Sequence, residues 1–235
     1  MESEPRAPSP PAEPRPDASA RAVRVWDFPT RVFHWLTVGL VAGAYVTQRY
    51  DWIDLHVKFG ETLLALVLFR LLWGFCGSET ARFRSFVAKP AAALDHLRHL
   101  LRREPDDQVG HNAAGGWMVL LLLALLLVET LTGLYVYNDV ADEGPLSQIA
   151  PAAVSNAISW LHAIGWNLLL AAVVLHVCAI AVYAIAKGHR LIGPMITGRK
   201  RLPASVPAPR RAPLWLAALL LAGSVAVVQL LAATM

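Results

Sequence analysis

Two histidines on one apolar segment, His162 and His176, have a spacing that suggests a chemical role. On an α-helix, their separation corresponds to roughly 21 Å of rise and a return to within about 40° of the same face. One helix would therefore present two imidazoles on one side, at two depths. Two more histidines, His34 and His56, lie in or at the edge of other apolar segments. Imidazoles that face one another across a gap can coordinate one metal from both sides.

The kind of metal follows from the number of ligands. A tetrahedral zinc site would need three or four ligands in one cluster. A pair of opposed histidines suits a six-coordinate haem, because the porphyrin fills the four equatorial positions. The sequence has no CxxCH motif, so the haem would be of the non-covalent b type, and no CxxC redox pair. For any one histidine taken alone, the alternative is a hydrogen-bonding residue at a helix interface.

Apolar runs in the chain supply the helices that must position these histidines. Of the 235 residues, 56% are hydrophobic and 16% are charged, whereas soluble domains carry roughly a quarter charged residues. Each run is near the ~20 residues that a helix needs to cross a hydrocarbon core. The sequence therefore predicts an all-α integral membrane protein with five spans, at about 32–48, 57–76, 113–137, 158–186 and 214–235. The first span can extend back through Pro29, with Asp27 as its N-cap.

Lysine and arginine are concentrated in alternate connections. The N-terminal segment to Arg31 has five, the connection between the second and third spans has six, and the one between the fourth and fifth has seven. The other two connections have two and none. Positive charge stays on the cytoplasmic side, which predicts a cytoplasmic N-terminus and a periplasmic C-terminus. This distribution accounts for the net charge of +4 without a nucleic-acid partner.

Orientation sets the depth of each histidine. The second and fourth spans run inward, so His56 and His162 both lie near the outer edge. His34 precedes Gln48 by roughly 21 Å of helix, which places it at the level of His176. The predicted pairs are therefore His56 with His162 and His34 with His176, stacked across the membrane.

Arg70 lies 14 residues after His56, the same separation as that between His34 and Gln48. It therefore lies at the level of the inner pair. An arginine at this depth is costly unless it is paired or reaches the interface. A haem propionate suits its planar guanidinium, and the alternative is snorkelling to the inner surface. Glycines near the histidines would either leave room for the macrocycle or allow close helix packing, and the sequence supports both equally: Gly39, Gly43, Gly60 and Gly165.

Other polar residues have less defined roles. Glu61 and Glu129 lie inside spans and are either hydrogen-bonded structural groups or proton relays near a quinone. His111, before the third span, would contact a propionate or water, and we expect water. Solvated surface positions are expected for the histidines of basic stretches, His96, His99 and His189, and buried free thiols for Cys76 and Cys178.

The flanking segments complete the organisation. Residues 1–22 are rich in Pro, Ala, Ser and charge, which predicts a disordered cytoplasmic tail. Residues 23–201 form the predicted haem-binding membrane domain, 202–213 a linker, and 214–235 an additional transmembrane helix. A short interfacial helix is expected in the inner connection, with an apolar stripe of Ala93, Leu94, Leu97, Leu100 and Leu101.

Four fragments, VWDFPTRVFHW, DLHVKFGETLLALVLFRLLWG, WLHAIGWNLLLAAVVLHV and LIGPMITGRKR, resemble the bacterial cytochrome b561 family, which includes the b-type cytochrome subunits of nickel–iron hydrogenases. The resemblance covers about 23–201 and implies a four-helix bundle that holds two haems b and passes electrons between quinone and a redox partner. The axial ligands that it implies fall on His34, His56, His162 and His176. The Pro-rich tail and the fifth apolar run lie outside it.

These observations predict a dihaem cytochrome of the bacterial inner (plasma) membrane, surrounded by lipid. It would transfer electrons between the quinone pool and a hydrogenase or c-type cytochrome. With two histidines on each iron, no position remains for a substrate, so no catalytic residue is expected. A stand-alone quinol-oxidising oxidoreductase is the alternative. A haem-free scaffold or transporter is a third possibility, which the level-matched histidine pairs disfavour.

Overall fold

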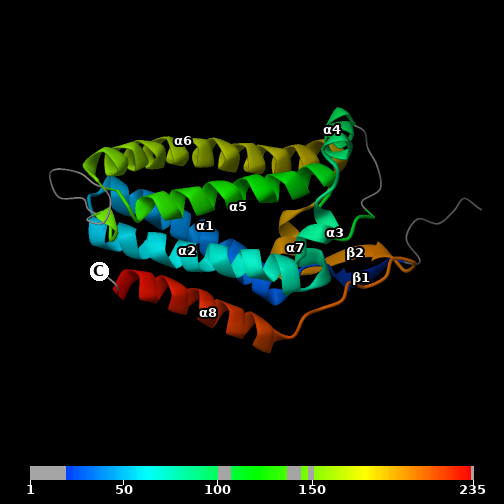
Figure 1. Cartoon of the computed structure of the whole chain (residues 1–235). Coiled ribbons are helices and arrows are strands. Elements are labelled where there is room, and N and C mark those ends of the chain that lie inside the picture. Colours follow the sequence, from blue (N-terminus) through cyan, green and yellow to red (C-terminus); the bar gives the residue numbers. More distant parts are fainter. Residues whose placement is uncertain (1–19, 100–106, 137–143, 148–150, 234–235) are drawn as a thin grey trace, which may run out of the picture.

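Long helices that lie side by side dominate the computed structural model (Figure 1). It describes residues 20–99, 107–136, 144–147 and 151–233. The long helices in these ranges are α1 (Phe28–Arg49), α2 (Ile53–Cys76), α5 (Ala113–Gly133), α6 (Ala152–Val182) and α8 (Leu214–Ala233). The shorter elements are β1 (Ala20–Arg24), a 3-10 turn (Glu79–Ala81), α3 (Phe83–Phe86), α4 (Pro90–Arg98), a π-helical turn (Tyr183–Lys187), α7 (Ile192–Thr197) and β2 (Arg199–Pro203).

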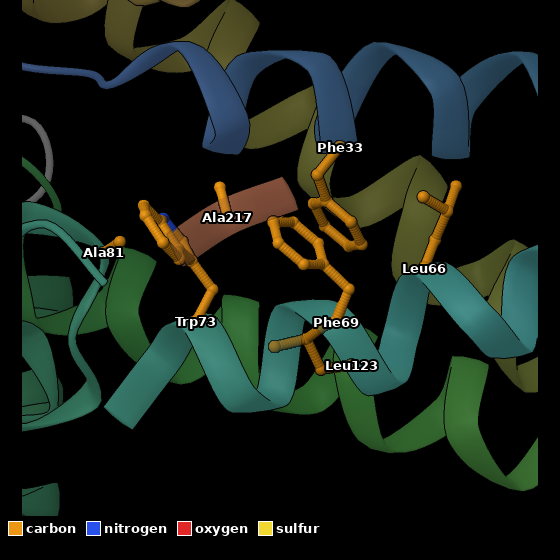
Figure 2. Packing of buried hydrophobic residues seen from close by; sticks show 7 residues of the cluster. All are labelled: Phe33, Leu66, Phe69, Trp73, Ala81, Leu123 and Ala217. Atoms are coloured by element: carbon orange, nitrogen blue, oxygen red, sulfur yellow. The ribbon is translucent and has the colours of Figure 1, made fainter. Parts of the chain in front are cut away.

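α2 lies at the centre of the helix bundle. α1 and α5 both contact α2, α6 contacts α5, and α8 lies against α2 as well. Aromatic side chains fill the space between α1 and α2, where Phe33 lies beside Phe69, with Trp73 one turn further along α2 (Figure 2). Ala217 brings α8 into the same cluster. α2 is therefore the central helix of the bundle.

Four helices in the described residues are long and apolar enough to cross a membrane: α2, α5, α6 with its π-helical extension, and α8. The prediction of five spans is confirmed for these four on length and composition. α1 has a sufficient length, but its hydropathy does not qualify it, because polar residues such as His34, Thr37 and Thr47 interrupt its apolar sequence. Its role as a span stays a prediction.

The predicted N-cap of α1 is confirmed. Asp27 Oδ1 accepts a hydrogen bond from Thr30 N at 2.8 Å, and Pro29 lies in the first turn. Asp27 Oδ2 accepts a second hydrogen bond, at 3.0 Å, from Nε1 of Trp73, which is fully buried at the end of α2. One carboxylate therefore caps α1 and fixes its first turn against α2.

An antiparallel ribbon of two strands is a feature that the sequence analysis did not predict. β1 and β2 pair from Ala20 with Pro203 to Arg24 with Arg199. Residues 20–22 and 202–203, assigned from sequence to the tail and the linker, are therefore strand residues; residues 1–19 lie outside the described ranges. The ribbon lies at the same end of the bundle as α3, α4 and α7, and the end of α8 lies at the opposite end (Figure 1). We call these the ribbon end and the loop end.

Hydrogen bonds hold α1 to the segment that follows α6. Arg31 Nη1 donates to Ile196 O, and Trp35 Nε1 donates to Met195 O at 3.3 Å. Val25 N donates to the carbonyl of Gly198, whose φ of +77° suits glycine. α7 therefore closes the ribbon end beside His34.

The helix predicted in the inner connection is confirmed as α4. Ala93 is buried, whereas Leu94 and Leu97 are each 51% exposed. Leu100 and Leu101 lie outside the described residues. Attachment of α4 to the membrane surface stays a prediction.

Replacing Trp73 by Phe should lower the free energy of unfolding by about 1–3 kcal/mol, because Asp27 Oδ2 would lose its buried donor. The measurement is the denaturation midpoint of the purified protein in mild detergent. Trp215→Phe on α8 is the matched control, because Trp215 is 68% exposed. Equal midpoints for the two variants would contradict this role of Trp73.

Candidate functional site

The structure brings His56 of α2 and His162 of α6 together near the loop end. Their ring centroids are 6.5 Å apart and their planes are nearly perpendicular, at 87°. Both side chains are half-buried inside an apolar bundle. The two residues belong to helices that are not sequence neighbours, so their approach is a property of the fold.

Each imidazole of this outer pair has its Nδ1 directed to a main-chain carbonyl. His56 Nδ1 donates to Ala44 O of α1 at 2.8 Å, and His162 Nδ1 donates to Glu129 O of α5 at 3.0 Å. Thr132 Oγ1 lies 3.1 Å from the same His162 nitrogen. Such bonds fix the ring orientation and leave Nε2 of each ring as the metal-binding nitrogen.

The distance between the rings fits a metal between them. A metal–imidazole bond is about 2 Å and the ring centroid lies about 1.1 Å behind the nitrogen, so two trans ligands have centroids about 6.2 Å apart. The observed 6.5 Å is close to this value. The outer pair therefore suits the two axial ligands of a six-coordinate haem iron.

A second polar group lies toward the ribbon end. It contains His34 of α1, His176 of α6 and Arg70 of α2. His34 and His176 lie close enough for their side chains to interact electrostatically. The Arg70 side chain is 2% exposed, and its guanidinium lies 5.4 Å from the centre of the Phe83 ring. His34 Nδ1 and Arg70 Nη1 are buried and lack a hydrogen-bond partner among the described residues.

His111 belongs to this inner group, and the expectation that it is solvated is wrong. Its ring lies between Trp26 and Phe86, at centroid distances of 4.6 and 4.8 Å. Burial, helped by the nearby charge of Arg70, lowers the pKa of His111 to about 3. The sequence signal was its position two residues before the start of α5.

The expectation for His96 is also wrong, because its ring contacts the end of α6. His96 Nε2 lies 2.6 Å from the hydroxyl of Tyr183, which also accepts a hydrogen bond from Asn112 Nδ2 at 2.7 Å. Tyr183 is buried and was not singled out from the sequence. His189 N donates to Tyr183 O at 3.1 Å, whereas His99 bonds its own helical turn through Asp95 O.

The four glycines near the histidines divide into two kinds. A Cβ on Gly43 would lie 2.6 Å from the Phe59 ring, and one on Gly165 would overlap Glu129 Oε2. These two allow close packing. A Cβ on Gly39 or Gly60 would meet nothing within 4 Å among the described residues. Gly39 is exposed on the outside of the bundle and Gly60 is partly exposed, so neither serves close helix packing here.

The intramembrane carboxylates also differ. Glu129 Oε1 lies 3.4 Å from His162 Nδ1, and Glu129 Oε2 is buried without a hydrogen-bond partner among the described residues. Glu61 is partly exposed on α2.

The two cysteines were expected to be buried, and this expectation is wrong. Cys76 and Cys178 are unpaired, as expected, but both are exposed on the outside of the bundle.

The outer and inner groups are separated by an apolar layer. Val67, Leu126 and Leu169 form its buried centre. Between α1 and α6, a stacked pair of rings, Tyr45 and Trp166, bridges the helices at a centroid distance of 5.4 Å. The bundle therefore contains two groups of polar side chains, one toward each end, with apolar side chains between them.

Comparisons with known proteins agree with this arrangement. A family model described as prokaryotic cytochrome b561 matches residues 25–198. The chain is also 23% identical over 215 residues to a "Probable Ni/Fe-hydrogenase B-type cytochrome subunit" of Rhizobium leguminosarum bv. viciae, which covers 77% of this chain and 89% of that relative. The matched region contains α1, α2, α5 and α6 with all four paired histidines. The chain therefore belongs to the prokaryotic cytochrome b561 family of membrane b-type cytochromes, which act in electron transfer.

Proposed function

We propose that the protein binds two haems b and carries electrons across the membrane between them. His56 and His162 would hold one haem near the loop end, and His34 and His176 would hold the other near the ribbon end. The observation that carries this proposal is the outer pair, in which both Nδ1 atoms are bonded to carbonyls and the rings stand 6.5 Å apart.

The bound haems supply reversible one-electron chemistry. The protein's contribution is to hold the ligands and exclude competing reactions. Carbonyls behind His56 and His162 fix the tautomer and strengthen each imidazole as a donor. Because both axial positions are taken by histidine, the site favours electron transfer over the binding of oxygen or substrate.

Arg70 supports the inner haem in this proposal. A buried guanidinium is costly unless an anion lies beside it, and Arg70 Nη1 has no hydrogen-bond partner among the described residues. A haem propionate is an anion of the right geometry for a planar guanidinium.

Electrons would pass between quinone and a redox protein. The Rhizobium relative is described as a hydrogenase subunit, and a partner of that kind, or a c-type cytochrome, fits a chain whose described residues are largely membrane helices. The quinone is the diffusible substrate that would link this protein to the membrane pool.

The ribbon end would face the cytoplasm. The strands carry Arg21, Arg24, Arg199, Lys200 and Arg201, and the positive-inside rule places such clusters inside. α1 would then cross the membrane together with α2, α5 and α6, which completes a haem bundle of four spans. α8 would be an additional span that ends at the periplasmic face.

Purified protein should contain two haems b per chain by the pyridine haemochrome assay, with a reduced-minus-oxidised spectrum of low-spin haem. His56→Ala and His34→Ala should each retain about half of this haem, because each variant removes one histidine from one of the two pairs. The control is His99→Ala, on the surface helix α4, with full haem content expected. A wild-type protein without haem, or a full complement in both ligand variants, would contradict the proposal.

Reporter fusions test the orientation. A phosphatase domain, which is active only in the periplasm, should be active when fused after Ala233 and inactive when fused after Pro213, just before α8. The expected difference follows from α8 crossing the membrane once from the ribbon end. Activity at both positions would show that the ribbon end is periplasmic or that α8 does not span.

A further inference from the structure

His111 lies outside the four predicted ligands, yet it is held inside the ribbon end. Its ring is packed between Trp26 and Phe86, and its Nδ1 is buried without a hydrogen-bond partner among the described residues. Burying a polar nitrogen without a partner is unfavourable. A leucine or phenylalanine would fill the same space without this cost, so the polar nitrogen requires an explanation.

The loop that carries His111 is fixed on both sides. Gly110 has a φ of +95°, and a Cβ there would lie 3.6 Å from Thr80. On the other side, Asn112 caps α5 by accepting a hydrogen bond from Gly115 N at 2.7 Å. Val109 packs into the apolar cluster under the ribbon. The position of the imidazole is therefore set by the backbone on either side of it.

Arg70 and His111 rest on the same one-turn helix, α3. The Arg70 guanidinium lies over Phe83, and the His111 ring lies against Phe86. These two phenylalanine rings are 5.8 Å apart and in edge contact. Of the cations that influence His111, Arg70 has the largest effect. One short helix thus contacts both the guanidinium and the imidazole.

Asp27 is a nearby carboxylate, but its oxygens are already engaged. Oδ1 accepts from Thr30 N and Oδ2 accepts from Trp73 Nε1. Asp27 acts on Arg70 through space, whereas Arg70 Nη1 and His111 Nδ1 each remain available to a further acceptor. Two buried nitrogens on one support fit the two oxygens of a carboxylate.

We propose that His111 and Arg70 together bind one carboxylate at the ribbon end, and that this carboxylate is a propionate of the inner haem. This inference rests on the proposed function and adds His111 to the haem-binding residues. Arg70 supplies the charge and His111 supplies a neutral N–H donor. The guanidinium of Arg70 would then face two carboxylates, Asp27 and the propionate, and its positive charge would offset part of both.

Binding of the propionate by His111 and Arg70, which we call the propionate clamp, should affect the redox equilibrium of the inner haem. Hydrogen bonds to a propionate offset its negative charge, and this favours the reduced iron. Removing the His111 donor should therefore favour the oxidised iron. The expected change is about tenfold in the oxidised-to-reduced ratio at a fixed potential, which lowers the midpoint by about 59 mV for a one-electron couple.

The test is a redox titration of the purified holoprotein in mild detergent, followed by haem absorbance. The inner haem is identified as the component that is missing from His34→Ala. His111→Phe keeps a ring between Trp26 and Phe86 but removes the N–H, and His111→Gln restores a donor. His99→Phe on α4 is the matched control, because its ring nitrogen bonds only the Asp95 carbonyl of its own helix among the bonds that the structure shows.

The proposal expects a lower midpoint for the inner component in His111→Phe, recovery in His111→Gln, and an unchanged outer component in both. It is overturned if both haems bind and the inner midpoint is unchanged, or if only the outer one moves. Unchanged midpoints with loss of reduction by quinol would assign the two nitrogens to a quinone head group instead. Should His111→Phe not accumulate, Arg70→Lys is expected to lower the same midpoint, and an unchanged value overturns the clamp.

Wild-type protein without haem would contradict the proposed function. A His111→Phe protein that holds two haems with an unchanged inner midpoint would contradict only the binding of the propionate by His111 and Arg70.

Discussion

Polar side chains inside an apolar bundle must find partners within the protein, because lipid offers none. This constraint explains the arrangement of the outer pair. His56 and His162 lie on α2 and α6, and each donates its Nδ1 hydrogen to a carbonyl of another helix, α1 or α5. All four helices of the proposed haem bundle thus contribute to one pair of imidazoles. The position of each helix is linked to the orientation of a ring.

The inner group meets the same constraint in another way. Among the described residues, His34 Nδ1, Arg70 Nη1 and His111 Nδ1 are buried without hydrogen-bond partners. They lie on α1, on α2 and in the segment before α5, beneath the ribbon and α7. Main-chain carbonyls satisfy the Nδ1 atoms of the outer histidines, although Glu129 Oε2 beside them has no partner among the described residues. At the inner level it is the side-chain nitrogens that lack partners. The two levels therefore differ in how much of the site the protein completes by itself.

Helical rise predicted the approximate depth of each histidine, and hydropathy predicted four of the membrane helices. The N-cap at Asp27 was also readable from the sequence, because a capping residue followed by a proline is a local pattern. What the sequence analysis missed depends on contacts between distant segments. His111 is buried by Trp26 and Phe86, and neither is near it in the chain.

The same limit applies to the strands and the glycines. β1 and β2 are short, polar and far apart, so no local periodicity marks them as a pair. Gly43 and Gly165 face side chains of a neighbouring helix, whereas Gly39 and Gly60 face none within 4 Å among the described residues. That information lies in the packing. The roles of the histidines as ligands remain predictions, supported by geometry.

The ribbon has a consequence for the order of assembly. β1 precedes the first helix, and its partner β2 follows α7, so the pairing of Ala20 with Pro203 joins the two ends of the haem-binding region. During synthesis β1 must wait until the whole of this region has been made. Long-range contacts of this kind form late because loop closure must be completed first. The loop-end pair of histidines needs only residues up to α6, whereas the ribbon end closes over His34 when β2 emerges. The site proposed for the inner haem is therefore the last part of this region to become enclosed.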